Sequence, residues 1–427
     1  MSSNYEASKA LALLENIKSI LHESGSLGPS ARASVLAQIS DLRDAIETPL
    51  DSVLRILAQP MQNVALRMAA ELGLLSRLAA DPNVTLGLDQ IASGQSSHKC
   101  SSICGKDDLE NGTDTPYSPD PSIADPELVG RFMRVLVAMG VCDEVQAESY
   151  KANKVTMALS QEGLSSGVKF RFDTEIPCAN KLVDFFRSTK YRNPEDSAAS
   201  PFKHAFGAPK FGWLQDNPET LANFNRWMTE RREAGKQLTW LDFYPVGQNL
   251  INGAEVDDSA IFCVDVGGGK GHDLDRLRSR FPAIPGRLIL QDSQIFSDHS
   301  TVFASMVHDF FQPQPLKGAR VYHLRAILHD WPTAECKKIL SHIVAAMKPN
   351  YSRLIIREFI LPDTNAPLLG SCNDLLMMVL LAGMERTDSQ WKRLLSDVGL
   401  EIVGFWTAVS GGEGVIEAVK KERIEQA

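Results

Sequence analysis

The 427-residue sequence lacks an apolar stretch of the roughly 20 residues that a membrane-spanning helix needs. It also lacks an excess of basic residues: 44 Lys and Arg against 53 Asp and Glu give a net charge of −9, which argues against a nucleic-acid partner. The segment MSSNYEASKALALLENIKSIL has no basic stretch ahead of an apolar one, so no secretory signal is expected. These absences favour a cytoplasmic protein with neither a membrane nor a nucleic-acid partner.

Cysteine is scarce. The seven cysteines are odd in number and irregularly spaced, which is typical of a reducing compartment rather than of a disulfide framework. The segment HKCSSIC places His98, Cys100 and Cys104 close together, but no second half of a metal site follows nearby. We therefore expect no metal site.

The N-terminal part has helical periodicity over residues 5–80. Leu11 and Leu14, and later Val35 and Ile39, recur at the three- and four-residue spacing of an amphipathic helix. A helical arm this apolar favours an interface over a monomer surface, so we expect a homodimer formed through these helices.

Two short helices, a third helix and two strands are expected over residues 71–93 and 124–160, an order typical of a winged-helix-like domain. Its third helix, PELVGRFMRVLVAMG, is mostly apolar with two arginines, which favours a structural role over DNA reading. Between these segments, residues 94–122 are rich in Ser, Gly, Asp and Pro and have no periodicity. Such a composition predicts a disordered surface insertion.

From residue 257 onward, short apolar runs alternate with helical stretches. AIFCVDVGG, GRLILQD, ARVYHLRAI and SRLIIREFIL are rich in β-branched residues, and LDRLRSRF, AECKKILSHIVAAM and SQWKRLLSDVG are helical. This alternation predicts an α/β domain, a doubly wound Rossmann-like sheet. We expect a helical domain over residues 1–235 and this α/β domain over residues 236–427.

A glycine-rich loop, VDVGGGKGH, follows the first of these strands and opens a helix. Glycines there allow a tight turn and a close approach of backbone amides to a ligand. Asp292 ends the next strand, where a carboxylate can bind both hydroxyls of a ribose. Asp265 lies ahead of the glycines, where it would repel a pyrophosphate but suit a cationic ligand. S-adenosylmethionine has the ribose and the positive charges and no phosphate; a loop without any ligand is the alternative.

A third contact point is HDFF, after another short strand. Asp309 can accept the adenine amino group, and Phe310 can cover the face of the ring.

The sequence as a whole resembles a family at this point. The segments VDVGGGKGH, LILQD, HDFF, LRAILHDWPTAECKKIL, IIREFILPD and GMERTDSQW are similar to those of S-adenosylmethionine-dependent O-methyltransferases of the caffeate and flavonoid type, including fungal secondary-metabolite enzymes. The IETP and RMAAELGLL segments also resemble that family's dimerisation domain. The insertion at 94–122 and the segment QDSQIFSDH depart from the family pattern. The resemblance implies methylation of a hydroxyl, phenolic in character, on a small aromatic or polyketide-like acceptor. It also places Arg325 near the cofactor.

His329 follows the strand RVYHLRAI, on the edge of the sheet where ligands bind in open α/β folds. A base with a pKa near 6.5 can take the proton of a phenol as the methyl bond forms. The resemblance implies that His329 is this proton acceptor; a core histidine bonded to a carbonyl is the alternative.

Two glutamates are candidates to orient His329 and stabilise its charged form. Glu358 ends the next strand, and Glu385 follows the apolar helix DLLMMVLLAG. Both match the pair of acids that flank the histidine in the family, although Glu385 alone would also suit an exposed helix end. We expect the catalytic residues to be His329, Glu358 and Glu385.

The remaining candidates bind ligands. The cofactor-binding candidates are Asp265, Gly267, Gly268, Gly269, Asp292, Asp309, Phe310 and Arg325. Apolar helical stripes, which are equally typical of core packing, offer a flat pocket whose candidates, together with a polar neighbour of the histidine, are Phe224, Met228, Asp330, Met377, Leu381 and Met384.

Two further functions stay open. Some fungal relatives of this family use the bound cofactor as a fixed cation to steer pericyclic ring closure, and they are expected to lack the catalytic base. A non-catalytic partner or DNA-binding regulator would need a basic recognition helix. The presence of His329, Glu358 and Glu385 favours methyl transfer over both.

Overall fold

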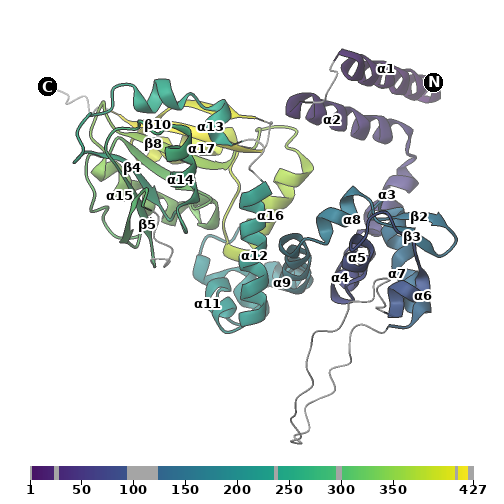
Figure 1. The fold of residues 1–427 in the computed structure, drawn as a ribbon. Helices are drawn as coiled ribbons and strands as arrows, with labels where there is room; N and C mark the ends of the chain where they lie inside the picture. The colour runs from purple at the N-terminus through teal and green to yellow at the C-terminus, as the bar shows by residue number, and fades with distance from the viewer. Residues whose placement is uncertain are drawn as a thin grey trace, which may run out of the picture. The chain divides into compact units, whose positions relative to one another are not determined.

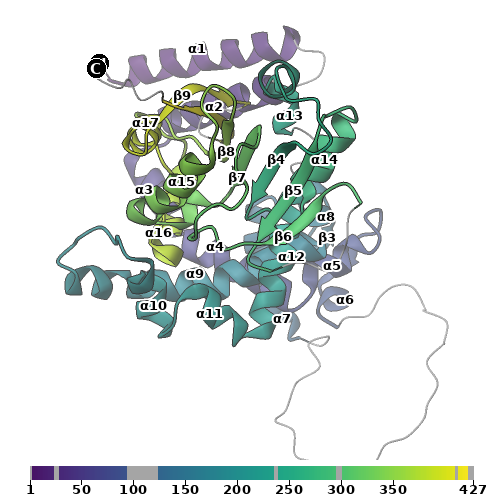
Figure 2. The ribbon, with the colours of Figure 1, turned by 90° about the vertical axis from the view of Figure 1, so that its left-hand side faces the viewer.

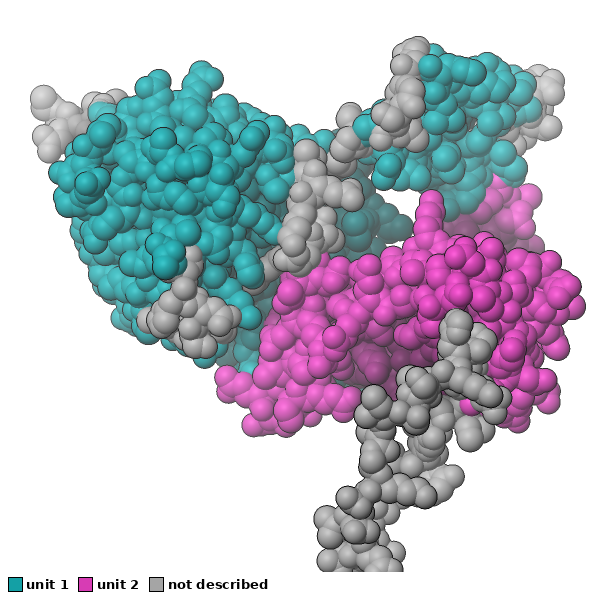
Figure 3. All heavy atoms as spheres, in the orientation of Figure 1, with its two compact units in different colours: residues 1–46, 178–213, 235–427 teal, residues 47–177, 214–234 magenta. Residues whose placement is uncertain are grey.

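The computed structural model describes residues 2–23, 28–93, 124–234, 239–294, 301–408 and 412–421. Two compact units are distinguished in Figure 3. Unit 1 comprises Met1–Ile46, Cys178–Trp213 and Gly235–Ala427, and unit 2 comprises Glu47–Pro177 and Leu214–Ala234. The expected division into residues 1–235 and 236–427 differs from these units, because two stretches of the first half cluster with the second half. The insertion expected at 94–122 and the HKCSSIC segment lie outside the described residues.

Unit 1 contains a seven-stranded sheet with the order β6-β5-β4-β7-β8-β10-β9. Its strands are β4 (Ile261–Val266), β5 (Arg287–Asp292), β6 (Ala304–Val307), β7 (Val321–Arg325), β8 (Arg353–Phe359), β9 (Leu400–Thr407) and β10 (Glu413–Lys420). The first five are parallel, whereas β10 lies antiparallel between β8 and β9. The strands expected from the apolar runs are thereby confirmed.

Helices cover both faces of this sheet, as Figures 1 and 2 show. One face packs on α15 (Thr333–Ala346) and α17 (Asp388–Asp397), the other on α13 (Trp240–Phe243), the π-helix η3 (Gly247–Ile251) and α14 (His272–Arg280). Along β8, Leu354 and Ile356 face one core and Ile355 the other, since successive strand residues point to opposite faces. The Rossmann-like α/β fold is therefore confirmed.

The other helices of unit 1 come from distant parts of the chain. They are α1 (Ser2–Glu23), α2 (Pro29–Ile46), η1 (Ser197–Ala199), α10 (Pro201–Phe206), α11 (Lys210–Gln215, which runs into unit 2), the short η4 (Leu328–Asp330) and α16 (Leu368–Leu381). The division between the units falls inside α9 (Glu162–Ser188), at Pro177. A proline within a helix cannot donate the backbone hydrogen bond, so this is a natural point for the division.

Unit 2 is mainly helical. Its elements are α3 (Pro49–Leu57), α4 (Gln59–Glu71), α5 (Leu74–Ala79), β1 (Leu86–Gly87), α6 (Leu88–Ser93), α7 (Pro126–Ala138), β2 (Asp143–Gln146), β3 (Ser149–Lys151), α8 (Lys154–Leu159), the first part of α9, and α12 (Pro218–Ala234). The strands form a small antiparallel sheet of order β1-β3-β2. Asp125 caps α7 by accepting from the amide of Glu127, and Pro126 begins the helix.

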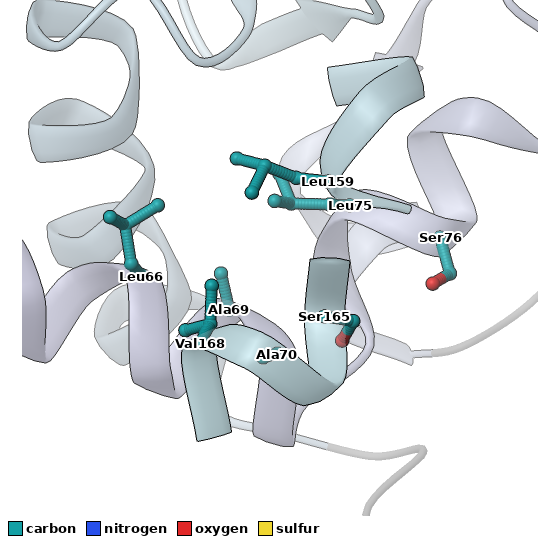
Figure 4. Close-up of a pocket in the computed structure, with 8 residues that line it drawn as sticks. All are labelled: Leu66, Ala69, Ala70, Leu75, Ser76, Leu159, Ser165 and Val168. Atoms are coloured by element: carbon teal, nitrogen blue, oxygen red, sulfur yellow. The ribbon is translucent and has the colours of Figure 1, made fainter. Parts of the chain in front are cut away.

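Unit 2 also has a small cavity of about 20 Å³ between α4, α5, α8 and α9, shown in Figure 4. Its lining is Leu66, Ala69, Ala70, Leu75, Ser76, Leu159, Ser165 and Val168. This space suits about one water molecule and has no titratable side chain in its lining, so the chemistry must lie elsewhere.

None of the described helices is long and apolar enough to cross a membrane.

Candidate active site

The glycine loop is fastened to the end of the neighbouring strand β5. The amide of Gly267 donates to Gln291 O at 2.7 Å, and the amide of Gly269 donates to Asp292 Oδ2 at 2.9 Å. Gly267 and Gly271 have φ of 72° and 78°, in the left-handed region that favours glycine. Asp292 Oδ2 thereby fixes the loop, and Oδ1 accepts the next amide in the chain at 2.7 Å.

The other cofactor-binding candidates on this edge also meet at the loop. A Cβ on Gly268 would overlap the Asp265 carboxylate, and a Cβ on Gly267 would lie 3.7 Å from Phe310 Cε1. Asp309 begins the adjacent turn, where its Oδ1 accepts the amide of Phe311 at 2.9 Å. The structure therefore brings Asp265, Phe310 and the glycines together; ligand binding by them stays a prediction.

Asp265 is buried and pairs with His323. Oδ1 of Asp265 lies 2.7 Å from Nδ1 of His323, across the pairing of β4 with β7. Oδ2 of Asp265 and Nε2 of His323 are buried and have no hydrogen-bond partner. An unpartnered buried carboxylate oxygen beside Gly268 is the kind of group that a cationic ligand would satisfy.

Arg325 lies in a ring of four charges. Its guanidinium donates to Asp273 Oδ2 at 3.0 Å, and its Nε lies 3.3 Å from Glu413 Oε1. Arg357 contacts the same two acids, so the ring joins β7, β8, β10 and the first turn of α14. The donors of Arg325 are therefore engaged by protein acids, and its expected contact with the cofactor stays a prediction.

The backbone of the turn that bears His329 is held by the side chain of Glu358. After β7, Ala326 has a φ of 51°, and η4 then carries His329 at the carboxyl edge of the sheet. Glu358 Oε1 accepts the amides of Ile327 and Leu328 at 2.9 Å each and that of His329 at 3.4 Å. One buried carboxylate thus replaces the hydrogen bonds that the tight turn cannot make internally.

Three acids surround the imidazole of His329. Its Nδ1 lies 2.9 Å from Glu385 Oε1 and 3.6 Å from Glu358 Oε2, and its Nε2 lies 3.4 Å from Asp330 Oδ1. Nδ1 therefore carries the proton toward Glu385, and Nε2 is the nitrogen available to a substrate. The expected grouping of His329, Glu358 and Glu385 is present in the structure.

These contacts move the pKa values. Burial alone would lower the pKa of His329, but Glu358, Asp330 and Glu385 overcome it and raise that pKa to about 10, above the value near 6.5 assumed from the sequence. Burial, opposed by His329, raises the pKa of Glu358 to about 7. Burial also raises the pKa of Asp330, while His329 and Lys210 oppose the rise. His329 is thus a much stronger base than a free imidazole.

His329, Glu358 and Glu385 also offer ligand atoms within 4.8 Å of one another, a spacing that a metal ion requires. Glu358 Oε1 is already used by three backbone amides, which favours a histidine–carboxylate network over coordination. The expectation of no metal site stays a prediction.

The substrate-binding candidates fall in different places. Phe224 and Met228 lie on α12 in unit 2, where the ring of Phe224 packs 5.0 Å from that of Phe170. Leu381 belongs to a buried hydrophobic cluster with Phe202 in unit 1. The other three candidates, Met377, Met384 and Asp330, lie near the His329 turn: Met377 O accepts the amide of Gly383, and the amide of Met384 donates to His329 O at 2.9 Å.

Sequence reasoning assigned no role in the site to several buried polar residues, among them His323, Lys210 and Arg386. His323 faces Asp265 only because β4 and β7 pair in this register, so no local pattern signals it. Arg386 lies directly after Glu385 in GMERT, and its donors point at the His329 turn. A charged residue beside a candidate catalytic acid was the available signal.

Comparisons with known proteins agree with this geometry. The family model described as an O-methyltransferase domain matches residues 181–401. Methyltransferase cfoC of Aspergillus candidus is 40% identical over 302 residues, which cover 70% of this chain and 75% of that protein. Demethylsterigmatocystin 6-O-methyltransferase of Aspergillus parasiticus is 34% identical over 303 residues, which cover 70% of this chain and 77% of that protein. The chain therefore belongs to the O-methyltransferase family.

A solved structure is similar over nearly the whole length. "The structure of LepI complex with SAM" has a TM-score of 0.79 and 26% identity, covering 97% of this chain and 100% of that one. A structure titled "A Pericyclic Reaction enzyme" matches equally well, with a TM-score of 0.78 and 26% identity over 97% of this chain and 100% of that one. A protein titled as a pericyclic reaction enzyme therefore has a fold similar to that of this chain.

Proposed function

We propose that this enzyme transfers a methyl group from S-adenosylmethionine to a hydroxyl, phenolic in character, of a small secondary metabolite, with His329 as general base. The observation that carries the proposal is the 2.9 Å contact between His329 Nδ1 and Glu385 Oε1 at the ligand-binding edge of the sheet. That contact orients the imidazole and leaves Nε2 for the acceptor hydroxyl.

The donor would be held by the glycine loop and the acids around it. When bound, S-adenosylmethionine supplies an activated methyl group on a sulfonium. The unpartnered Oδ2 of Asp265 gives the loop a buried negative group that suits a cationic ligand. Asp292 and Asp309 supply carboxylates for the polar parts of the nucleoside, and Phe310 supplies a ring face beside Gly267.

His329 would take the proton of the acceptor. A phenol has an ordinary pKa of about 10, and the pKa of His329 is raised to about 10, so proton transfer between them is close to balanced. For a histidine of ordinary pKa, about 6.5, the same transfer would be unfavourable, because the pKa of the phenol is higher by about 3.5 units. His329 must first lose its own Nε2 proton, so the acids that raise its basicity also make the rate depend on pH.

We also propose that the candidate pocket residues contact the acceptor, with Met377 and Met384 against its flat face and Asp330 at its polar edge. Met384 and Asp330 belong to segments that touch at the His329 backbone, which supports this assignment. The roles of Phe224, Met228 and Leu381 in acceptor binding stay predictions from the sequence. Methionine side chains adapt well to flat apolar ligands.

A homodimer is part of the proposal. The helix α3 has no buried residue, and Leu50, Leu54 and Leu57 on it are exposed by 64%, 55% and 69%. Exposed apolar side chains at this helical spacing suit burial against a second copy of the chain. We assign the dimerisation role to α1–α3 and a winged-helix-like form to α5–α7 with the β1-β3-β2 sheet. Light scattering after gel filtration tests it: Leu54→Glu should give monomers, and a monomeric wild type would contradict the assignment.

Cofactor-steered ring closure is the second candidate, favoured by the likeness to the structure titled "A Pericyclic Reaction enzyme". In that reaction no methyl group moves, and the cofactor is recovered unchanged. His329 would then not be needed as a methyl-transfer base.

The test uses methyl-labelled S-adenosylmethionine and a metabolite extract of the organism that encodes the protein. Wild type and His329→Ala are assayed side by side, each with and without a chelator, and products are read by mass spectrometry. We expect a labelled product with wild type that the chelator does not change, and about 10²–10⁴-fold less of it with the variant. Full activity of His329→Ala would contradict the mechanism, and an unlabelled isomer formed only with cofactor would favour ring closure.

A further inference from the structure

The carbonyl groups of the His329 turn are bound by one buried arginine. Arg386 Nη1 donates to Leu328 O at 2.9 Å, and Arg386 Nη2 donates to Trp331 O at 3.1 Å. These carbonyls bracket His329. The thiol of Cys336 lies 3.1 Å from Leu328 O and 3.2 Å from Trp331 O, so it supports the same pair.

Arg386 is buried, and its hydrogen-bond donors are used in these contacts with the His329 turn. It is 2% exposed, and its guanidinium donates to the carbonyl oxygens of Leu328, Trp331 and Met384 and to Cys336 Sγ. Its guanidinium lies over the ring of Trp391 at 5.4 Å. A buried cation is costly unless its donors are bound, and the planar fork of arginine places two nitrogens on two separate carbonyls, whereas lysine has one nitrogen for both.

The residues just before Arg386 hold the same turn. The amide of Met384 donates to His329 O at 2.9 Å, and Glu385 Oε1 meets His329 Nδ1 at 2.9 Å. Three consecutive residues therefore bind the turn. Met384 bonds the carbonyl of His329, Glu385 bonds its ring, and Arg386 bonds the carbonyls on either side. A shift of the turn against this segment would lengthen the contact with Glu385.

We propose that Arg386 is a positioning residue, which clamps the turn 328–331 so that the His329 ring stays in contact with Glu385. Its catalytic meaning rests on the proposed role of His329, but the clamp itself does not require methyl transfer. The proposal can therefore be tested without an acceptor.

The direction in which the pKa of His329 changes when Arg386 is replaced distinguishes a positioning role from an effect of its charge. If Arg386 acted on His329 through its charge alone, its removal would raise the pKa of His329, because a nearby cation disfavours the imidazolium. If Arg386 acts as a clamp, its removal loosens the contact with Glu385, and the pKa of His329 falls toward the ordinary value near 6.5.

The experiment is an NMR titration of the full-length protein labelled with ¹³C at histidine Cε1, with the His329 signal assigned by His329→Gln. Arg386→Met, Arg386→Lys and the control Arg353→Met are compared; Arg353 faces Glu417 at 3.5 Å, away from the turn. We expect the midpoint of His329 to fall by at least one pH unit in both Arg386 variants and to stay in place in the control.

A midpoint that rises in Arg386→Met, or that is unchanged in Arg386→Lys, would overturn the clamp. Should Arg386→Met fail to fold, the lysine variant decides, since it keeps the charge and the stem. Once an acceptor is known, both variants should lose at least tenfold in kcat while the Kd for S-adenosylmethionine stays within twofold. If His329 proves dispensable for turnover, the proposed function fails while the titration still reports on the clamp.

Discussion

Gly383 lies directly against the carbonyl oxygen of His329, so closely that a Cβ on Gly383 would overlap that oxygen. Backbone atoms meet there without an intervening side chain. The contact lets the segment that carries Glu385 and Arg386 reach the turn that carries His329.

Gly383→Ala adds only one methyl group, but it should lower both the stability of the protein and its turnover. The added methyl must push the two backbones apart, which typically costs about 1–3 kcal/mol. We expect a lower free energy of unfolding by denaturant and a loss of turnover. Gly212→Ala is the matched control, because Gly212 lies in α11 with nothing within 4 Å of its Cβ position. Equal stability of the two variants would contradict the close contact.

The rate of methyl transfer should rise with pH from 7 toward 10. The pKa of His329 is raised to about 10, so the neutral, proton-accepting form increases about tenfold for each pH unit below that value. Glu385→Gln removes the acid bonded to Nδ1, so the rise should shift to lower pH. A profile of kcat against pH at saturating donor measures both, with the ionisation of the acceptor measured separately. Coincident profiles for the two proteins would argue against the role of Glu385.

The same group should make stability depend on pH. Because the folded pKa of His329 lies above the unfolded value near 6.5, its contribution to stability is fully present below pH 6.5 and is lost as pH rises to about 10. We expect this loss to be smaller in His329→Gln, as seen by denaturant unfolding at pH 6 and pH 9. An identical pH dependence in both proteins would contradict the raised pKa.

Glu358 and Glu385 should respond differently to truncation. Glu358→Ala leaves three amides of the turn without their acceptor, and each buried unsatisfied donor costs about 1–3 kcal/mol. Glu385→Ala removes only one hydrogen bond to the ring. Thermal unfolding should therefore show the greater loss for Glu358→Ala, whereas Glu385→Ala should chiefly lower turnover. The reverse order of melting temperatures would exclude this division of roles.

Asp273→Asn should lower the free energy of unfolding at neutral pH, and by much less in acid. Burial alone would raise the pKa of Asp273, but Arg357 and Arg325 hold it well below its usual range. Its stabilisation is thus present above the unfolded pKa of about 3.9 and is lost as pH falls through the lower folded value. Breaking a buried pair costs about 3–5 kcal/mol, so unfolding free energies at pH 7 should differ by about that much, and the difference should begin to shrink below about pH 4. Asp257→Asn, at an exposed turn, serves as the control.

The sequence predicted the features that depend on neighbours along the chain. The apolar runs marked β4, β5, β7 and β8, and the glycine loop was correctly placed between β4 and α14. His329, Glu358 and Glu385 were selected from strand ends, and the parallel order of the sheet brings strand ends to one edge.

Other features depend on pairing in space. The contact of His323 with Asp265 follows from the register of two strands that are distant in sequence. The raised pKa of His329 follows from three acids on different elements, so an ordinary value was assumed from the sequence. The grouping of Met1–Ile46 with the sheet-bearing unit likewise has no local signal.

The position of β10 has a consequence for the order of folding. β10 follows β9 in the chain but lies between β8 and β9, so β9 has no strand to pair with in the sheet until β10 is in place. Glu413, the first residue of β10, then closes the ring of charges with Arg325 and Arg357. β9 can therefore join the sheet only once β10 has paired with β8, a contact between residues about 60 positions apart in the chain and thus non-local. A ribosome-bound chain that has not yet released β10 would therefore leave β8, the strand that carries Glu358, as an open edge of the sheet.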